Sequence, residues 1–157
     1  MDKVSWWMEI AETIAKKSTD AETKVGAILV NTKTGAILAS GYNGFVRGAP
    51  DLELPNTRPD KYPYMIHAEQ NLICNCARHG ISMDNCIIIC TLSPCVRCMR
   101  YLWQCGITTI ICKELYGDVG SINSMEDLNT TIKVMKQFYK ITYMSKEPGY
   151  KEDRVYV

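Results

Sequence analysis

Four residues, His67, Glu69, Cys95 and Cys98, have the types and spacing that suit a catalytic zinc site. They occur in the motif HAE, which starts at residue 67, and in the motif PCVRC, which starts at residue 94. One imidazole and two thiolates fill three of the four tetrahedral positions that zinc favours. The fourth position then stays open to water, which distinguishes a catalytic zinc site from a closed structural one. The Glu69 carboxylate is left free for proton transfer.

The elements around these residues must bring them to one point. Residues two apart on a helix project about 200° apart, so His67 and Glu69 can face one metal only if a helix begins there. Cys95 and Cys98 are three apart and share a helix face, and Pro94 is expected to set the start of that helix. Two helix N-termini would therefore converge on the zinc, and their partial positive charges would favour thiolates.

Each part of this pattern has a simpler explanation when taken alone. An isolated C-x-x-C is often a redox pair or half of a zinc finger, and a single histidine at a helix start is often a core residue. A closed structural zinc would need a fourth cysteine or histidine, and a redox pair would need neither His67 nor Glu69. The only other histidine is His79, and no second C-x-x-C exists, so a second metal site has no support in the sequence.

Apolar periodicity and turn residues predict alternating helices and strands. The strand around Ile88 is apolar without alternation, which is typical of strands that are buried on both faces. The order strand, helix, strand predicts parallel neighbours joined by a crossover. We therefore expect an α/β fold, a three-layer α/β/α sandwich with a mixed central sheet, as one domain over residues 1–157. The predicted helices are 5–17, 67–79 (ended by Gly80), 95–104 and one from Ser124; the predicted strands are 25–30, 36–40, 86–91, 108–112 and 139–144, with a long loop over 41–65.

The composition argues against nucleic-acid and membrane partners. The net charge is +1 over 157 residues, which gives no long-range attraction to a polyanion. Charged residues interrupt the N-terminal segment, and no stretch approaches the roughly 20 apolar residues of a membrane span. Eight cysteines without a signal peptide indicate thiols or metal ligands in a reducing compartment. We expect a cytoplasmic protein.

The chain resembles the deoxycytidylate (dCMP) deaminases of the cytidine deaminase superfamily, especially the compact phage-type enzymes. The resemblance covers most of residues 5–120. It includes the zinc motifs, which tRNA adenosine deaminases share, TKVGA from Thr23, SGYNG from Ser40, and Arg47-Gly48. It implies a cytidine deaminase-like fold and zinc-dependent hydrolysis of dCMP to dUMP and ammonia. It also implies homohexamers, activation by dCTP and inhibition by dTTP, with Mg²⁺ accompanying the triphosphate.

The resemblance also implies two sets of nucleotide contacts. Without the resemblance, Asn43 could equally be a turn residue, Lys24 could be a solvated strand end, and Arg78 could be a surface arginine. The arginine expected beside Tyr116 is replaced by Gly117, so the sequence does not determine which residues bind the substrate phosphate. The substrate contacts are Lys24, Asn43, Ala68, Ser93 and Tyr116; the effector contacts are Tyr42, Gly44, Arg47, Gly48 and Arg78.

Other functions remain open at this point. The chain could deaminate another cytosine nucleotide such as dCTP, or a nucleobase in tRNA or DNA. The near-neutral charge and the 41–48 loop favour a small nucleotide over a polynucleotide. A zinc-stabilised nucleotide-binding module without activity would have no use for Glu69.

Overall fold

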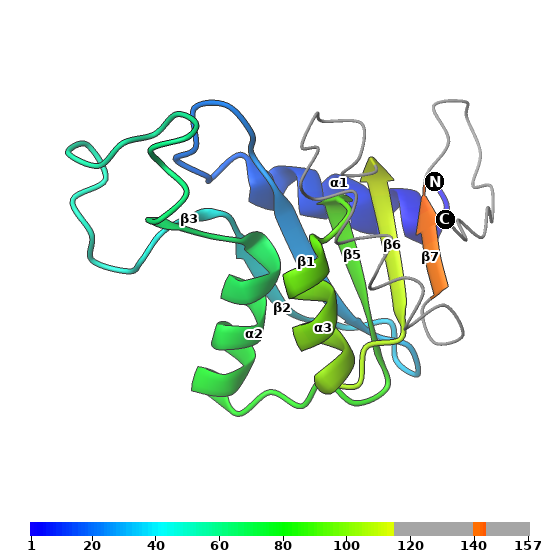
Figure 1. Cartoon of the computed structure of the whole chain (residues 1–157). Coiled ribbons are helices and arrows are strands. Elements are labelled where there is room, and N and C mark those ends of the chain that lie inside the picture. The colour runs from blue at the N-terminus through cyan, green and yellow to red at the C-terminus, as the bar shows by residue number, and fades with distance from the viewer. Residues whose placement is uncertain (115–139, 144–157) are drawn as a thin grey trace.

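The computed structural model describes residues 1–114 and 140–143, and its centre is a five-stranded mixed sheet (Figure 1). The strands are β1 (Gly26–Asn31), β2 (Ile37–Tyr42), β5 (Cys86–Leu92), β6 (Thr109–Glu114) and β7 (Lys140–Tyr143), in the order β2-β1-β5-β6-β7. β1 runs antiparallel to both β2 and β5, whereas β5, β6 and β7 are parallel. The predicted mixed sheet and the parallel pair across a crossover are confirmed.

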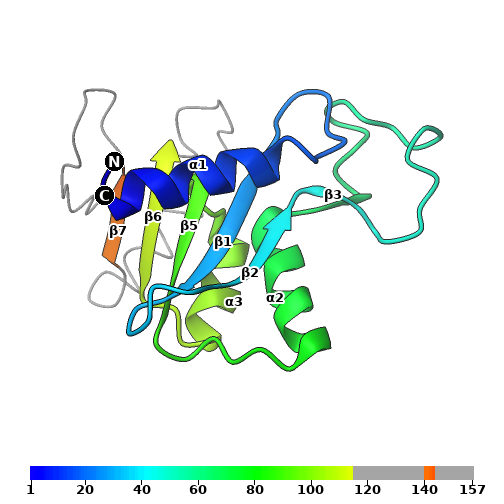
Figure 2. The same ribbon diagram turned by 180° about the vertical axis from the view of Figure 1, so that it is seen from behind.

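Helices cover both faces of this sheet. α1 (Lys3–Ala15) lies on one face, and α2 (Ala68–His79) and α3 (Val96–Gln104) lie side by side on the other, as the front and back views agree (Figures 1 and 2). Two short strands, β3 (Gly44–Phe45) and β4 (Met65–Ile66), pair antiparallel beside the start of α2. The three-layer α/β/α arrangement predicted from the sequence is confirmed.

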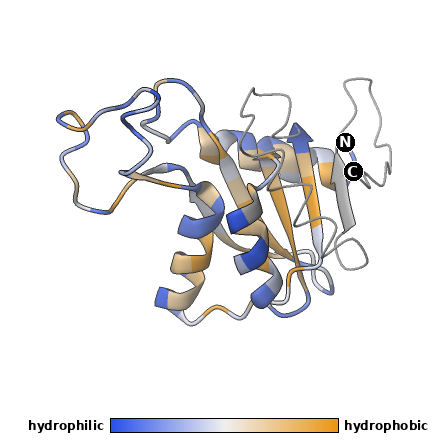
Figure 3. Ribbon diagram, in the orientation of Figure 1, coloured by the Kyte–Doolittle hydropathy of each residue, from blue (hydrophilic) through white to orange (hydrophobic). Residues whose placement is uncertain are grey.

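Alternate residues of the central strands serve the two apolar layers. Leu29, Ile88 and Ile110 join the core cluster that includes residues of α2 and α3. Their neighbours Ile28 and Ile89 pack with residues of α1. The middle parts of the central strands are accordingly apolar, while the helices carry polar residues on their outer sides (Figure 3). Each fully buried aliphatic side chain contributes about 1.5–3 kcal/mol, which makes the sheet a rigid platform for the helix ends above it.

Several predicted boundaries were wrong. α1 begins two residues before the predicted start because the Asp2 carboxylate accepts a hydrogen bond from the Ser5 backbone N–H at 2.9 Å. β2 continues past residue 40, since Tyr42 and Gly41 still pair with β1. β3 and β4 also form inside the predicted 41–65 loop, so its irregular part is shorter, residues 46–64.

Other predicted elements are matched or lie outside the described residues. β7 corresponds to the strand predicted over 139–144. α2 ends where predicted, at Gly80, which has the left-handed φ of 65° that glycine tolerates best. The helix predicted from Ser124 falls outside residues 1–114 and 140–143. Within those residues, no helix has the length and apolarity that a membrane span requires.

Candidate metal centre and active site

His67 and Cys95 are the N-cap residues of the two helices on one face of the sheet. His67 precedes α2 with φ −72° and ψ 156°, and Cys95 precedes α3 with φ −68° and ψ 165°. Because an N-cap has an extended backbone, His67 escapes the 200° separation that would otherwise keep it from Glu69. The predicted convergence of two helix N-termini is therefore present. Pro94, which was expected to set the start of this helix, stands directly before its N-cap residue Cys95.

The three candidate ligands have the spacing of a tetrahedral zinc site. The Sγ atoms of Cys95 and Cys98 each lie 3.5 Å from Nδ1 of His67, and all three atoms lie within 4.8 Å of one another. Zinc bonds of ordinary length at the tetrahedral angle would place nitrogen and sulfur about 3.6 Å apart. The donor set thus fits zinc without rearrangement. Among the described residues no other histidine, cysteine and carboxylate cluster has this compactness.

The site is electrostatically prepared for a cation. A hydrogen bond from Cys98, aided by His67, lowers the pKa of the Cys95 thiol. The hydrogen bond to Cys95, together with burial, raises the pKa of the Cys98 thiol. The hydrogen bond between His67 and Cys95 raises the pKa of the His67 imidazole. Binding of a metal by two thiolates would displace the protons that these cysteines still carry.

Glu69 lies beside the ligand set in the first turn of α2. Its side chain is buried, with only 4% of the residue exposed. Burial raises the pKa of the Glu69 carboxyl to about 6, and the carboxyl interacts with the Cys98 thiol. A carboxyl with a pKa near neutrality can both accept and return a proton at neutral pH. This is the arrangement that a proton shuttle requires, and Glu69 is not needed as a ligand.

Gly41 lets the start of α2 approach the sheet closely. A Cβ atom at this position would lie 2.3 Å from the Ala68 carbonyl oxygen and 2.6 Å from the Leu72 backbone nitrogen. Two asparagines of α2 bond to β2 on either side of Gly41. The Asn71 side chain donates to the Tyr42 carbonyl, and the Asn75 side chain donates to the Ser40 carbonyl. The helix start that carries His67 and Glu69 is thereby fixed to the edge strand.

We expect Gly41→Ala to push the start of α2 off the sheet. The clash is with backbone atoms, which cannot rotate away, so it should cost at least the 1–3 kcal/mol typical of overpacking and weaken zinc binding. Gly44→Ala is the matched control, because a Cβ atom there would meet nothing closer than 3.8 Å. Thermal melting and zinc content measure both effects. Equal stability and zinc content in the two variants would contradict this role for Gly41.

The predicted substrate residues lie at different places in the described structure. Ala68 opens α2 and Ser93 follows β5, both buried. In the antiparallel pair of β3 and β4, Gly44 lies opposite Ile66. The residue before Gly44, Asn43, therefore lies opposite the residue after Ile66, which is His67. Its carboxamide is already bonded within the chain: Oδ1 accepts from the Val25 N–H at 2.8 Å. Its Nδ2 donates to the carbonyl of Thr23 at 2.8 Å. Tyr116 lies outside the described residues.

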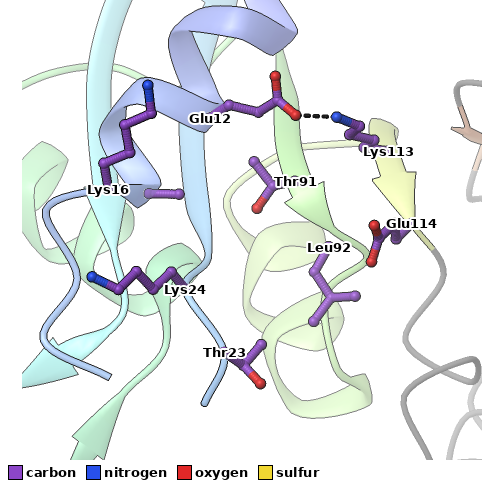
Figure 4. A pocket seen from close by; sticks show the side chains of 9 residues that line it. Glu12, Lys16, Thr23, Lys24, Thr91, Leu92, Lys113 and Glu114 are labelled. Carbon is purple, nitrogen blue, oxygen red and sulfur yellow. Dashed lines mark hydrogen bonds and ion pairs between the residues drawn. The ribbon is translucent and has the colours of Figure 1, made fainter. Parts of the chain in front are cut away.

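Lys24 lines a pocket at the carboxyl ends of β5 and β6 (Figure 4). Its volume is about 310 Å³, and its walls include Lys16, Lys113, Thr23 and Leu92. The Lys113 ammonium pairs with Glu12 across the pocket, which leaves Lys24 and Lys16 as its other cations. From this end of the sheet the chain runs on to Ser93 and the zinc motif. Carboxyl ends of parallel strands are the usual ligand-binding edge of α/β sheets.

The predicted effector residues divide into two groups. Arg47 and Gly48 are exposed in the 46–64 loop, where Gly48 has a φ of 84°, and the half-exposed Tyr42 and the buried Gly44 lie nearby on β2 and β3. Arg78 is exposed in the last turn of α2, about 15 Å along the helix from its start.

Sequence reasoning missed the residues that anchor these segments. Asp20, Lys61, Asn71 and Asn75 carry no catalytic motif, and the partners that they bind in other segments are 23 to 41 residues away in the sequence. The only signal in the sequence is that Asn71 and Asn75 stand four residues apart, on one helix face.

Comparison with known proteins identifies the family. The profile described as "Cytidine and deoxycytidylate deaminase zinc-binding region" matches residues 1–114. The deoxycytidylate deaminase of Mus musculus is 35% identical over 119 residues, which are 70% of this chain and 65% of that enzyme, slightly under two thirds of its length. ComE operon protein 2 of Bacillus subtilis is 28% identical over 92% of this chain and 84% of its own length.

A solved structure is similar over nearly the whole chain. It is the dCMP deaminase of the cyanophage S-TIM5 in complex with dCMP and dUMP, with 31% identity, a TM-score of 0.69, and coverage of 89% of this chain and 95% of that one. This similarity confirms the predicted cytidine deaminase-like fold. A profile that covers more than half of the residues, together with a relative at 35% identity, supports one conclusion: this chain belongs to the cytidine and deoxycytidylate deaminase family.

Proposed function

We propose that this protein hydrolyses dCMP to dUMP and ammonia with one zinc ion held by His67, Cys95 and Cys98. The observation that carries the proposal is the compact ligand set with the buried Glu69 carboxyl beside it. The similarity to a phage enzyme solved with dCMP and dUMP supports the choice of substrate. The product would supply dUMP for thymidylate synthesis.

Glu69 carries the proton through the reaction. When bound, zinc would lower the pKa of a water molecule to about 7 and so supply a nucleophile at neutral pH. Glu69 accepts the proton of the attacking water and delivers it to the ring nitrogen beside the attacked C4 of cytosine. Glu69 then moves the second proton of the former water from the new C4 hydroxyl to the amine, the C4–N bond breaks, and ammonia departs while the C4 carbonyl of dUMP remains. One carboxyl serves both steps because it is ionised again after each proton has been passed on.

A panel of substrates tests this proposal directly. Ammonia release should be fastest with dCMP and slower with CMP, deoxycytidine, dCTP and a cytosine-containing oligonucleotide. A preference for dCTP would move the assignment to another nucleotide, and activity on the oligonucleotide alone would indicate a polynucleotide deaminase. Bound zinc with no activity on any of them would leave a nucleotide-binding module.

Lys24 is proposed to contact the substrate phosphate from the pocket wall. A charged hydrogen bond contributes about 1.5–3 kcal/mol, so Lys24→Met should raise KM for dCMP about 10-fold or more. KM for deoxycytidine, which has no phosphate, should change little. Lys33→Met in the exposed β1–β2 turn is the control. An equal change in KM for both substrates would show that Lys24 does not contact the phosphate.

We also propose that the enzyme is a cytoplasmic homohexamer regulated by nucleoside triphosphates. dCTP with Mg²⁺ would activate and dTTP would inhibit, through Tyr42, Gly44, Arg47 and Gly48 of one subunit and Arg78 of another. The exposure of Arg47, Gly48 and Arg78 supports this arrangement. Opposite effects at one site require that each ligand prefer a different state of the assembly. Light scattering and rate curves with each triphosphate test the two claims.

A further inference from the structure

A buried ion pair joins two irregular segments near the metal centre. Lys61, in the 46–64 loop, places its Nζ 2.9 and 2.8 Å from the two carboxylate oxygens of Asp20. The side chains are only 4% and 3% exposed. Asp20 belongs to the segment between α1 and β1, and both views show this segment running beside the loop (Figures 1 and 2). The pair ties the two segments together away from solvent.

Asp20 passes this connection on to the predicted substrate wall. Its Oδ1 accepts the backbone N–H groups of Glu22 at 2.8 Å and Thr23 at 2.9 Å. Its Oδ2 accepts Nδ2 of Asn43 at 3.4 Å, and the Asn43 carboxamide in turn bonds the backbone on either side of Lys24. The network therefore includes Asn43, which lies opposite the metal ligand His67, and ends on the backbone that flanks Lys24, a residue of the pocket wall.

Stability alone does not explain a pair of this kind. A buried ion pair loses hydration that its attraction barely recovers, and well-packed apolar residues are often equally stable in its place. What the pair provides is one fixed geometry. Burial tends to raise the pKa of Asp20, but the bonds from Lys61, Thr23 and Glu22 outweigh it and hold that pKa below its ordinary value. Asp20 is thus a charged acceptor for several donors at once.

A second link between the same segments serves as an internal comparison. Arg58 of the loop pairs with Glu22 at 3.3 Å, and the two side chains are 39% and 32% exposed. Solvent-exposed pairs of this type are weak and adaptable. Lys61 Nζ also lies 3.4 Å from a Glu22 carboxylate oxygen, and Arg58 also donates to the Thr23 hydroxyl at 2.7 Å. Lys61 and Arg58 therefore connect the same two segments, Lys61 mainly through the buried Asp20 and Arg58 through partly exposed side chains.

We propose that Lys61 and Asp20 are positioning residues for substrate binding. Their pair holds Lys24 and Asn43 at a fixed place relative to the zinc ligands, so the wall for the sugar and phosphate is formed before the nucleotide arrives. Such preorganisation lowers the ordering cost of binding. The proposal rests on the proposed function, because it takes the nucleotide to lie between Lys24 and the metal centre.

The test compares Lys61→Met with Arg58→Met in the full-length zinc-loaded protein. Lys61→Met should raise KM for dCMP about 10- to 100-fold, the range that small misplacements of a bound group produce. We expect kcat to stay within about 3-fold and zinc content to stay unchanged, because neither residue touches the ligands. Arg58→Met should leave KM within about 2-fold. An unchanged KM in Lys61→Met, or a loss of zinc, would overturn the proposal.

A double variant separates positioning from a purely structural role. Lys61→Met alone leaves the Asp20 carboxylate buried without a counter-charge and should lower the melting temperature. Adding Asp20→Asn removes that charge and still offers an oxygen to Glu22 and Thr23, so the melting temperature should recover. KM should remain raised, since the buried link between Lys61 and Asp20 is still missing. Recovery of KM together with the melting temperature would refute positioning.

Amide hydrogen exchange gives a readout that needs no substrate. The Glu22 and Thr23 amides should exchange faster in Lys61→Met and in the double variant than in the wild type, whereas the amides of α2 should not change. If the wild type deaminates none of the cytosine substrates, the proposed function fails, but the exchange still decides whether the pair fixes this segment. Unchanged exchange at Glu22 and Thr23 would reject that role.

Discussion

Glu69→Gln is expected to lower kcat for dCMP by about 10²- to 10⁴-fold, the usual contribution of a positioned general acid–base group, while zinc stays bound. The amide has the same shape as the carboxyl but can neither take the proton of the attacking water nor return it to the ring. Zinc should be retained because the three ligand atoms form a complete set without Glu69. The fold should also persist, since a neutral amide is less costly to bury than a carboxylate.

Kinetics and metal analysis on the same preparation measure this result. Glu69→Ala should be equally inactive, because it also removes the proton carrier. Glu9→Gln makes the same chemical change on the exposed side of α1 and should leave kcat unaltered. Near-normal activity of Glu69→Gln would show that another group carries the proton. Loss of zinc from that variant would make Glu69 a ligand.

Cys98→Ala is expected to abolish both zinc binding and deamination. Cys98 is fully buried and its sulfur lies 3.5 Å from the His67 Nδ1, so its removal takes one of the three donors out of the ligand set. Changes in the outer shell of zinc sites already cost about 10- to 100-fold in affinity, and loss of a direct ligand should cost more. Because metal binding adds to folding free energy, the melting temperature should also fall and become independent of added zinc.

The matched control is Cys90→Ala. Cys90 is also fully buried, but it lies on β5 and is not among the candidate ligands, so its removal should cost packing energy and leave about one zinc per chain. Treatment of the wild type with a chelator should abolish activity, and added zinc should restore it. A Cys98→Ala variant that kept stoichiometric zinc, or a structure with a fourth protein ligand, would contradict the three-ligand site.

The sequence by itself determined the chemistry of the centre and the class of fold. The ligand identities are intrinsic to the side chains, and the spacing within HAE and PCVRC is local, so helix geometry alone predicted that two helix starts would meet at the metal. The apolar run around Ile88 likewise predicted a strand buried on both faces, because sheet burial depends on side-chain hydrophobicity. The comparisons confirmed the family that these motifs indicated.

Only the tertiary structure decided how the surroundings of the centre are held. The role of Gly41 depends on a helix 27 residues later in the chain that approaches within van der Waals contact. The sequence offered Asn43 as a substrate contact or a turn residue and gave no sign that its carboxamide bonds the start of β1, as the structure shows. The Asp20–Lys61 pair spans 41 residues without any motif. Contacts of this kind depend on packing between distant segments and leave no periodicity or local spacing in the sequence. They therefore cannot be predicted from one amino-acid sequence alone.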